Sequence, residues 1–297
     1  MPDATALDRP PAWLDRTEYP FDPKWLDRPA GRVHYVDEGE GRPVVLLHGN
    51  PTWSFLYRHL IRGLSDEYRC VAPDLLGFGR SAKPSPSDFS YRPAAHARVV
   101  ERLIDDLGLR DPVVVGHDWG GPLALDYATR NPDAVSGIAA LNTWMWPRER
   151  LLPRVISRAV GNPAGRYLVL RHNAFARTAV GLPHVAGLGV DETAYRHYLG
   201  PLGSPADRIG SWTLVRELLG SRDWLAALWD RRAAVADTSA LLLWGARDPV
   251  QGPLLRRWQA LFPAADTVVY DGVGHFVPEE VGPDLVGPVR RFLRRNA

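Results

Sequence analysis

An aspartate occupies the position of a nucleophile in the short segment GHDWG, residues 116–120. The segment follows the β-branched run Val113–Val115 and precedes apolar residues at helical spacing, so it fits the G-x-nucleophile-x-G turn between a strand and a helix. Glycines flank such a turn because the chain reverses sharply and leaves no room for neighbouring side chains. We therefore expect the turn to raise Asp118 above the end of a buried strand.

The carboxylate of Asp118 limits the chemistry that this turn can perform. Attack of a carboxylate on a carbonyl carbon would give an unfavourable mixed anhydride. Attack on a saturated carbon with a leaving group gives an ordinary ester on the enzyme. Asp118 therefore indicates displacement at an sp3 carbon, either of a halide or within a strained epoxide. The alternative interpretation is that Asp118 caps the helix that follows, since Asp is a favoured N-cap residue.

A base and an acid that suit this nucleophile follow later in the chain, in the order that α/β hydrolases use. His275, in the compact loop GVGHF after the last expected strand, would activate water against the ester on Asp118. Asp248 follows another expected strand and would orient the imidazole and stabilise its cation. The competing acid position, after the preceding strand, holds the neutral Asn142, so we choose Asp248 by elimination. Asp248 would alternatively cap a helix at Pro249.

A departing halide needs hydrogen-bond donors, because an anion that loses water without compensation is costly to form. The indole N–H of Trp119 donates and does not accept, and the side-chain amide of Asn50 offers a second donor from a neighbouring loop. The backbone N–H groups of the same two residues can form an oxyanion hole for the second step. The alternatives are core packing for Trp119 and a turn position before Pro51 for Asn50.

The order of the expected elements predicts an α/β fold with a mostly parallel sheet and helices on both faces. Expected strands cover residues 31–38, 44–47, 69–72, 113–115, 136–141, 240–244 and 267–270, and expected helices cover 54–64 and 93–107. The segment 146–212 shows amphipathic helical stretches with proline and glycine breaks, and no strand pattern. We predict a helical lid at 146–212, inserted between the two parts of one core, residues 1–145 and 213–297.

The composition is that of an ordinary soluble globular protein, with 45% hydrophobic and 24% charged residues. The formal net charge of +2 gives no reason to expect nucleic acid or a membrane as a partner. We see neither the apolar segment of a secretory signal nor a stretch that could span a bilayer. Cys70 is the single cysteine, which excludes internal disulfides and a cysteine-rich metal site. We expect a cytoplasmic enzyme that needs neither a metal nor an organic cofactor.

The chain resembles the haloalkane dehalogenases in several segments along its core. These are HGNPTWSFLYR (48–58), DLLGFGRS (74–81), GHDWGG (116–121) and GHF (274–276). The resemblance implies the α/β-hydrolase fold. It also implies that a small apolar haloalkane reacts with water, through an alkyl-aspartate ester, to give an alcohol and a halide. The lid carries no motif that matches the family.

The resemblance also assigns roles to the candidate residues. It implies that Asn50 and Trp119 form the halide-binding pair beside the nucleophile Asp118. The acid at Asp248, with Asn142 where other members carry a glutamate, is similar to the subgroup that combines this pair with a late aspartate.

Other functions stay open on the sequence. An epoxide hydrolase would use the same nucleophile, base and acid, and would add two proton-donating lid tyrosines, for which the chain offers Tyr167, Tyr195 and Tyr198. A fluoroacetate-type dehalogenase would carry an arginine in place of Trp119 to hold a carboxylate. A ligand receptor on this fold would not require the acid–base set, and a luciferase-like oxygenase is a further alternative. We rank dehalogenase first and epoxide hydrolase second.

Overall fold

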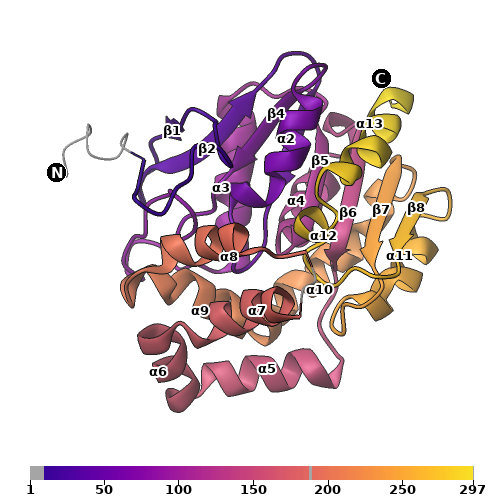
Figure 1. The fold of residues 1–297 in the computed structure, drawn as a ribbon. Helices are drawn as coiled ribbons and strands as arrows, with labels where there is room; N and C mark the ends of the chain where they lie inside the picture. The colour runs from indigo at the N-terminus through magenta and orange to yellow at the C-terminus, as the bar shows by residue number, and fades with distance from the viewer. Residues whose placement is uncertain (1–9, 187–188, 297) are drawn as a thin grey trace.

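A central eight-stranded sheet organises the molecule, in the order β1-β2-β4-β3-β5-β6-β7-β8 (Figure 1). The computed structural model describes residues 10–186 and 189–296. Residues 1–9, part of the N-terminus in which we expected no secretory signal, lie outside the described residues. β1 and β2, and β2 and β4, pair antiparallel, whereas every other pair is parallel. This arrangement confirms the predicted α/β fold with a mostly parallel sheet.

The strand positions agree with the sequence pattern, except at the sheet edge. The strands are β1 (Lys24–Leu26), β2 (Val33–Glu38), β3 (Pro43–Leu47), β4 (Arg69–Pro73), β5 (Val113–Asp118), β6 (Gly137–Thr143), β7 (Ala240–Gly245) and β8 (Asp266–Tyr270). The unpredicted β1 has three residues, too few for a visible alternation, and forms by pairing with β2. β5, β6 and β7 are buried throughout, as expected for strands covered on both faces.

Helices of the core cover both faces of this sheet. Apolar residues of α3, α4, α10 and α11 pack in one buried cluster, and those of α2, α12 and α13 pack in another. The predicted helix 54–64 begins as a 3-10 turn, η1, and continues as α2. The core helices are η1 (Ser54–Tyr57), α2 (Arg58–Leu64), α3 (Pro93–Asp106), α4 (Gly120–Arg130), α11 (Leu255–Leu261), α12 (Val277–Glu280) and α13 (Val286–Arg295). Short 3-10 helices are η2 (Pro132–Ala134), η6 (Gly252–Leu254) and η7 (Gly282–Leu285).

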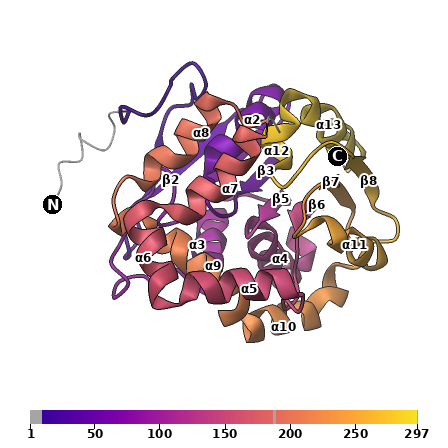
Figure 2. The ribbon, with the colours of Figure 1, turned by 60° about the horizontal axis from the view of Figure 1, so that its bottom comes forward.

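The segment between β6 and β7 is helical. It contains α5 (Leu151–Gly161), α6 (Pro163–His172), α7 (Ala174–Val185), α8 (Glu192–Leu199), η3 (Gly200–Leu202), η4 (Ala206–Arg208), α9 (Ile209–Gly220), α10 (Arg222–Asp230) and η5 (Arg231–Val235). Figure 2 shows α5, α6 and α7 in front of the strand ends. The division at 145 and 212 stays a prediction, and residue 212 falls inside α9. Along the described ranges, no helix combines the length and the apolar character needed to cross a bilayer.

The parallel strands bring the candidate residues to one edge of the sheet. Asn50 follows β3 and Asp118 ends β5, and these two strands are direct neighbours. Asp248 follows β7, and His275 follows β8, which pairs with β7. Since the carboxyl ends of parallel strands share an edge, residues more than 200 positions apart meet there.

Candidate active site

The turn after β5 holds Asp118 in a strained conformation. Its φ of +50° lies in the left-handed region, which non-glycine residues adopt at a free-energy cost. Helix α4 begins at Gly120, with Trp119 at the N-cap position. A side chain at residue 120 would place its Cβ only 1.8 Å from the carbonyl oxygen of Leu47, so glycine is required. The local geometry is therefore the strand–turn–helix that the GHDWG segment predicts.

The two carboxylate oxygens of Asp118 have different surroundings. Oδ1 accepts a hydrogen bond from the backbone N–H of Asn50 at 2.9 Å. Oδ2 lies 3.6 Å from Nε2 of His275. Burial raises the pKa of Asp118, while the His275 cation and the backbone N–H groups of Asn50 and Trp119 act in the opposite direction. Oδ1 of Asp118 is hydrogen-bonded to the loop after β3, and helix α4 has no side-chain cap hydrogen bond, so the interpretation of Asp118 as a helix cap is wrong.

His275 links this carboxylate to Asp248. Its Nδ1 donates to Oδ2 of Asp248 at 2.6 Å, which leaves Nε2 directed towards Asp118. Burial is the largest single effect on the pKa of His275 and lowers it. The charge and the hydrogen bond of Asp248, together with the charges of two further carboxylates, outweigh burial and raise the pKa to about 9. Burial raises the pKa of Asp248. The His275 cation, together with the hydrogen bonds that the carboxylate accepts, outweighs burial and holds the pKa at about 2. His275 is therefore hydrogen-bonded to Asp248 and lies within ion-pair distance of Asp118.

Asp248 also organises its own loop, although it does not cap a helix at Pro249, because the next helix, η6, begins at Gly252 with Gln251 at its N-cap position. Its Oδ1 accepts the backbone N–H groups of Val250 at 2.8 Å and Gln251 at 3.0 Å. Asn142, the neutral residue at the competing acid position, donates to Oδ2 at 2.9 Å and accepts the N–H of Gly245 at 2.8 Å. This supporting role of Asn142 was not predicted from the sequence. Its place at the end of the strand beside β7 is the signal that could have shown it.

Asn50 and Trp119, the two residues of the halide-binding prediction, lie beside Asp118. Both are buried. Nδ2 of Asn50 donates to the backbone oxygen of Ser211 in α9 at 3.0 Å, and since an amide has two N–H groups, one is left for an anion. The Trp119 ring packs edge-on against Trp144, with the ring centroids 4.8 Å apart. The hydrogen bond between Asn50 and the lid residue Ser211 was not predicted from the sequence.

A buried arginine beside the acid loop also escaped prediction. Arg148 is 5% exposed, and its guanidinium donates to the Gln251 side chain at 3.0 Å. Burial lowers its pKa to about 10, while the nearby charges of Asp118 and Asp248 act in the opposite direction. The cation also lies over the ring of Trp144, 4.8 Å from the centroid. Arg148 therefore adds positive charge near both carboxylates and fixes the loop that carries the acid.

The histidine loop is held from both sides. Glu280 accepts the backbone N–H of Gly274 at 2.6 Å and that of Phe276 at 2.8 Å, so one carboxylate binds the residues on either side of His275. Nε2 of His117 donates to the backbone oxygen of His275 at 2.8 Å. The pair of glutamates in the short helix after GHF is the sequence signal that could have suggested this role for Glu280.

The lid tyrosines do not supply the donors that epoxide opening requires. Tyr167 is 57% exposed on α6. The Tyr198 hydroxyl donates to Glu279, a partner in the core. The Tyr195 ring stacks on His184, with the centroids 5.0 Å apart. With one hydroxyl at the surface and another engaged by a carboxylate, the structure does not favour the epoxide hydrolase alternative.

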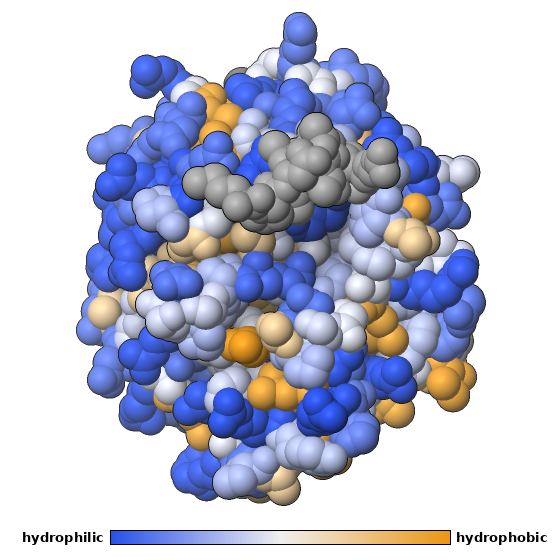
Figure 3. All heavy atoms as spheres, turned by 90° about the vertical axis from the view of Figure 1, so that its left-hand side faces the viewer, coloured by the Kyte–Doolittle hydropathy of each residue, from blue (hydrophilic) through white to orange (hydrophobic). Residues whose placement is uncertain are grey.

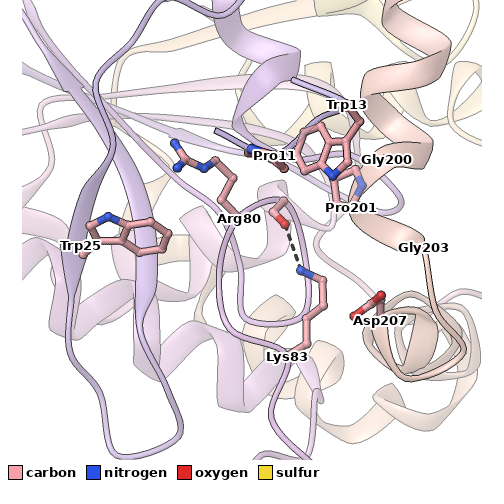
Figure 4. Close-up of a pocket in the computed structure, with 10 residues that line it drawn as sticks. Pro11, Trp13, Trp25, Arg80, Lys83, Gly200, Pro201, Gly203 and Asp207 are labelled. Carbon is pink, nitrogen blue, oxygen red and sulfur yellow. Dashed lines mark hydrogen bonds between the residues drawn. The ribbon is translucent and has the colours of Figure 1, made fainter. Parts of the chain in front are cut away.

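A hollow elsewhere on the molecule contains none of the candidate residues. Its volume is about 290 Å³, and it lies between the N-terminal segment and the lid (Figure 4). Trp13, Trp25 and Asp207 line it, together with Lys83, which donates to the backbone oxygen of Gly79. Within residues 10–186 and 189–296, no group of three or more His, Cys, Asp or Glu side chains is arranged to hold a metal ion.

Comparison with known proteins identifies the family. The α/β hydrolase fold family matches residues 42–280. Haloalkane dehalogenase 2 of Mycobacterium tuberculosis is 40% identical over 281 residues, which cover 92% of this chain and 96% of that protein. The chain belongs to the haloalkane dehalogenase family. This confirms the family resemblance, while the subgroup with a late aspartate stays a prediction.

Two other proteins show how this dehalogenase-family chain compares more widely. The crystal structure of haloalkane dehalogenase DbeA from Bradyrhizobium elkani matches with a TM-score of 0.79 and 27% sequence identity, covering 93% of this chain and 99% of that one. A cis-3-alkyl-4-alkyloxetan-2-one decarboxylase of Shewanella oneidensis is 31% identical, covering 93% of this chain and 90% of that protein. The likeness to both extends over the core and the lid.

Proposed function

We propose that this enzyme is a hydrolase of carbon–halide bonds that converts a haloalkane and water into an alcohol, a halide ion and a proton through an ester on Asp118. The observation that carries the proposal is the unequal placement of the Asp118 oxygens. Oδ1 is held by the backbone N–H of Asn50, and Oδ2 faces His275. Such an arrangement suits a nucleophile that becomes an ester and is then hydrolysed.

In the first step, Oδ2 of Asp118 attacks the carbon that bears the halogen. A carbon–oxygen bond forms, and the carbon–halogen bond breaks with its electron pair leaving on the halide. We assign the indole N–H of Trp119 and the remaining amide N–H of Asn50 as donors to this ion. The ionised carboxylate needs no base for this step.

In the second step, Nε2 of His275 takes a proton from water while the water oxygen attacks the ester carbon of Asp118. The negative charge that develops on Oδ1 is stabilised by the backbone N–H groups of Asn50 and Trp119. The bond between the Asp118 carboxyl carbon and the alkyl oxygen breaks, and the alcohol leaves with the proton that His275 holds. The carboxyl group of Asp118 then releases the second water proton and is again ionised. Ester formation removes the Asp118 charge that contributes to the raised pKa of His275. The pKa of His275 therefore falls, and a larger fraction of the histidine is neutral and able to accept a proton.

The proposed partners are a small apolar haloalkane, water and the halide product, with no nucleic acid. We propose that no metal or organic cofactor takes part, because the nucleophile, base, acid and halide donors are all side chains or backbone groups of this chain. A cytoplasmic location is supported by the single, buried Cys70, which needs no oxidising compartment.

The decisive experiment separates the two steps with His275→Ala. This variant lacks the base, so we expect it to release about one bromide per active site from 1-bromobutane and then stop. Intact-mass measurement should show a butyl adduct, and peptide mapping should place it on Asp118. Asp118→Asn is the control and should release no bromide, because an amide is a poor nucleophile. An adduct on another residue, or none, would overturn the assignment.

The decarboxylase relative names a second substrate class for the same assay. Purified parent enzyme is given a bromoalkane, a styrene-oxide-like epoxide and a cis-dialkyl oxetanone, with and without a chelator. We expect bromide release that the chelator does not change, and little turnover of the other two. We favour the haloalkane because the dehalogenase relative is 40% identical and the decarboxylase 31%. Faster loss of carbon dioxide from the oxetanone would reverse this ranking.

A further inference from the structure

Exposed hydrophobic side chains gather on three lid helices, α5, α6 and α7. Among the described residues, eight large hydrophobic side chains are exposed, and seven of them belong to these helices. Their exposed fractions reach 74% at Leu151 and 85% at Val185. The seven are Leu151, Leu152, Val155, Tyr167, Leu168, Leu182 and Val185. Soluble proteins seldom gather exposed apolar side chains in this way without an interaction partner.

The charged side chains of the same helices are all positive. Residues 151–185 contain five arginines and no lysine, aspartate or glutamate. Because the whole chain has a formal net charge of +2, the remaining residues carry −3. All five guanidinium groups belong to exposed residues, namely Arg154, Arg158, Arg166, Arg171 and Arg177. The small net charge of the chain therefore hides a strongly basic face.

The basic and apolar side chains are interleaved. On α5, Leu151 and Val155 are one helical turn apart, and Arg154 and Arg158 follow the same spacing beside them. On α6, Arg171 lies one turn after Tyr167. The three helices lie at the end of the molecule away from the core helices (Figure 1) and face the viewer in Figure 2. On the adjoining face shown in Figure 3, hydrophobic residues stand among hydrophilic ones in the lower half.

We propose that this lid face, residues 151–185, docks on an anionic lipid surface without spanning it. Helices that combine exposed apolar residues with arginines lie in the lipid headgroup region, where the apolar side chains are buried and the cations meet anionic headgroups. No helix within the described ranges could cross the bilayer, which agrees with interfacial binding. The expectation of no membrane partner rested on the small net charge and on the lack of a bilayer-spanning stretch, and neither observation bears on binding at the lipid surface.

Charge favours lipid over the two other candidate occupants. A second copy of this chain, placed symmetrically, would bring two faces that each contain five arginines and no acid into contact, and like charges repel. Nucleic acid would satisfy the arginines, but its phosphate backbone offers nothing to the exposed leucines and valines. An anionic bilayer accommodates both kinds of side chain.

A hollow lies between α5 and the loop that follows Asp248. Its volume is about 360 Å³, and Leu151, Leu152 and Val155 line it together with Pro249 and Val250. The backbone N–H of Val250 is bonded to the carboxylate of Asp248. Docking would thus bring lipid-dissolved apolar molecules close to the candidate site. This last consequence rests on the proposed function, whereas lipid binding itself does not.

Vesicle co-sedimentation tests whether the lid arginines contribute to lipid binding. The protein is mixed with phosphatidylcholine vesicles, and with vesicles in which roughly a quarter of the lipid is phosphatidylglycerol. We expect binding to the anionic vesicles alone, weakened by high salt. Arg154→Gln with Arg158→Gln should weaken binding about thirtyfold, since each arginine near the surface contributes about fivefold. The matched control removes two exposed arginines at the same spacing on α3, Arg98 and Arg102, and should bind like the parent.

A second pair of variants tests the apolar contribution. Leu182→Ser with Val185→Ser removes two exposed side chains of α7, and Val269→Ser removes the exposed side chain of β8. We expect the first to reduce vesicle binding and the second to leave it unchanged, with thermal unfolding used to show that each variant is folded. Failure of the parent to sediment with anionic vesicles would overturn the proposal. Equal losses in the lid and control variants, or a stable dimer broken by the arginine variants, would also overturn it.

Discussion

At the scale of single residues, Trp119 carries two donors with separate tasks. Its backbone N–H stabilises the charged carboxylate of Asp118, and its indole N–H is the donor that we assign to the halide. The ring is 2% exposed and packs against Trp144, so burial alone is compatible with a packing role. A substitution that keeps the ring volume and removes the N–H distinguishes the two roles.

Trp119→Phe should slow halide release by roughly 10²-fold, the usual effect of losing one donor to a developing charge. It should also weaken inhibition by added bromide, because the product ion loses the same donor. Initial rates with a bromoalkane, measured with and without bromide, check both effects. The control is Trp144→Phe, which removes an indole N–H from the neighbouring ring and should change the bromide inhibition far less. Parent-like activity in Trp119→Phe would assign this side chain to packing.

At the scale of elements, the short helix α12 controls the histidine loop through Glu280. Its carboxylate binds the backbone on both sides of His275, and its charge contributes to the raised pKa of that histidine. Because the charge of Glu280 raises the pKa of His275, removing that charge lowers the pKa. A histidine with a lower pKa stays neutral, and so acts as a base, down to a lower pH.

Glu280→Gln should therefore shift the acidic limb of the ester-hydrolysis rate to lower pH. It should also reduce the maximal rate, since an amide N–H₂ would face one of the two backbone N–H donors. Single-turnover measurements over a range of pH separate the two effects. Asp284→Asn removes an equal charge from an exposed position in η7 and should leave the profile unchanged. A loss of rate without a pH shift would limit Glu280 to a structural role.

At the scale of the whole molecule, a cluster of buried hydrogen bonds around Glu279 helps to tie the lid to the core. The Tyr198 hydroxyl of α8 donates to Glu279, which also forms two hydrogen bonds with Arg58 of α2. Glu279 lies four residues after His275. The lid, the first core helix and the histidine loop therefore meet at one carboxylate.

Tyr198→Phe should lower the free energy of unfolding by about 1.5–3 kcal/mol, the usual contribution of a hydrogen bond to a charged group. In a chain of this size the loss corresponds to a fall in Tm of roughly 2–5 °C. Thermal unfolding followed by circular dichroism measures it. Tyr195→Phe, three residues earlier on α8, is the control, because no hydrogen bond of its hydroxyl is found in the part of the chain that the structure describes. Equal shifts in both variants would contradict a specific role for the Glu279 contact.

The sequence by itself determined the fold class and the order of the candidate residues. The GHDWG turn is visible in the sequence because its steric demands act over five neighbouring residues, as the positive φ of Asp118 shows. The buried strands are visible because uninterrupted apolar runs mark strands covered on both faces. The parallel sheet then places Asn50, Asp118 and His275 at one edge, although their roles stay predictions.

Only the tertiary structure decided which distant groups complete the site. Asn142 bonds to Asp248, Ser211 bonds to Asn50, and Glu280 clamps the loop of His275. The partners in the first two contacts are 106 and 161 residues apart, so no local pattern links them. The tertiary structure also placed Tyr167 at the surface and left the arginines of α5, α6 and α7 exposed. The physical reason is the same throughout: sequence spacing shows what a segment can bury, whereas packing between segments decides which side chains meet.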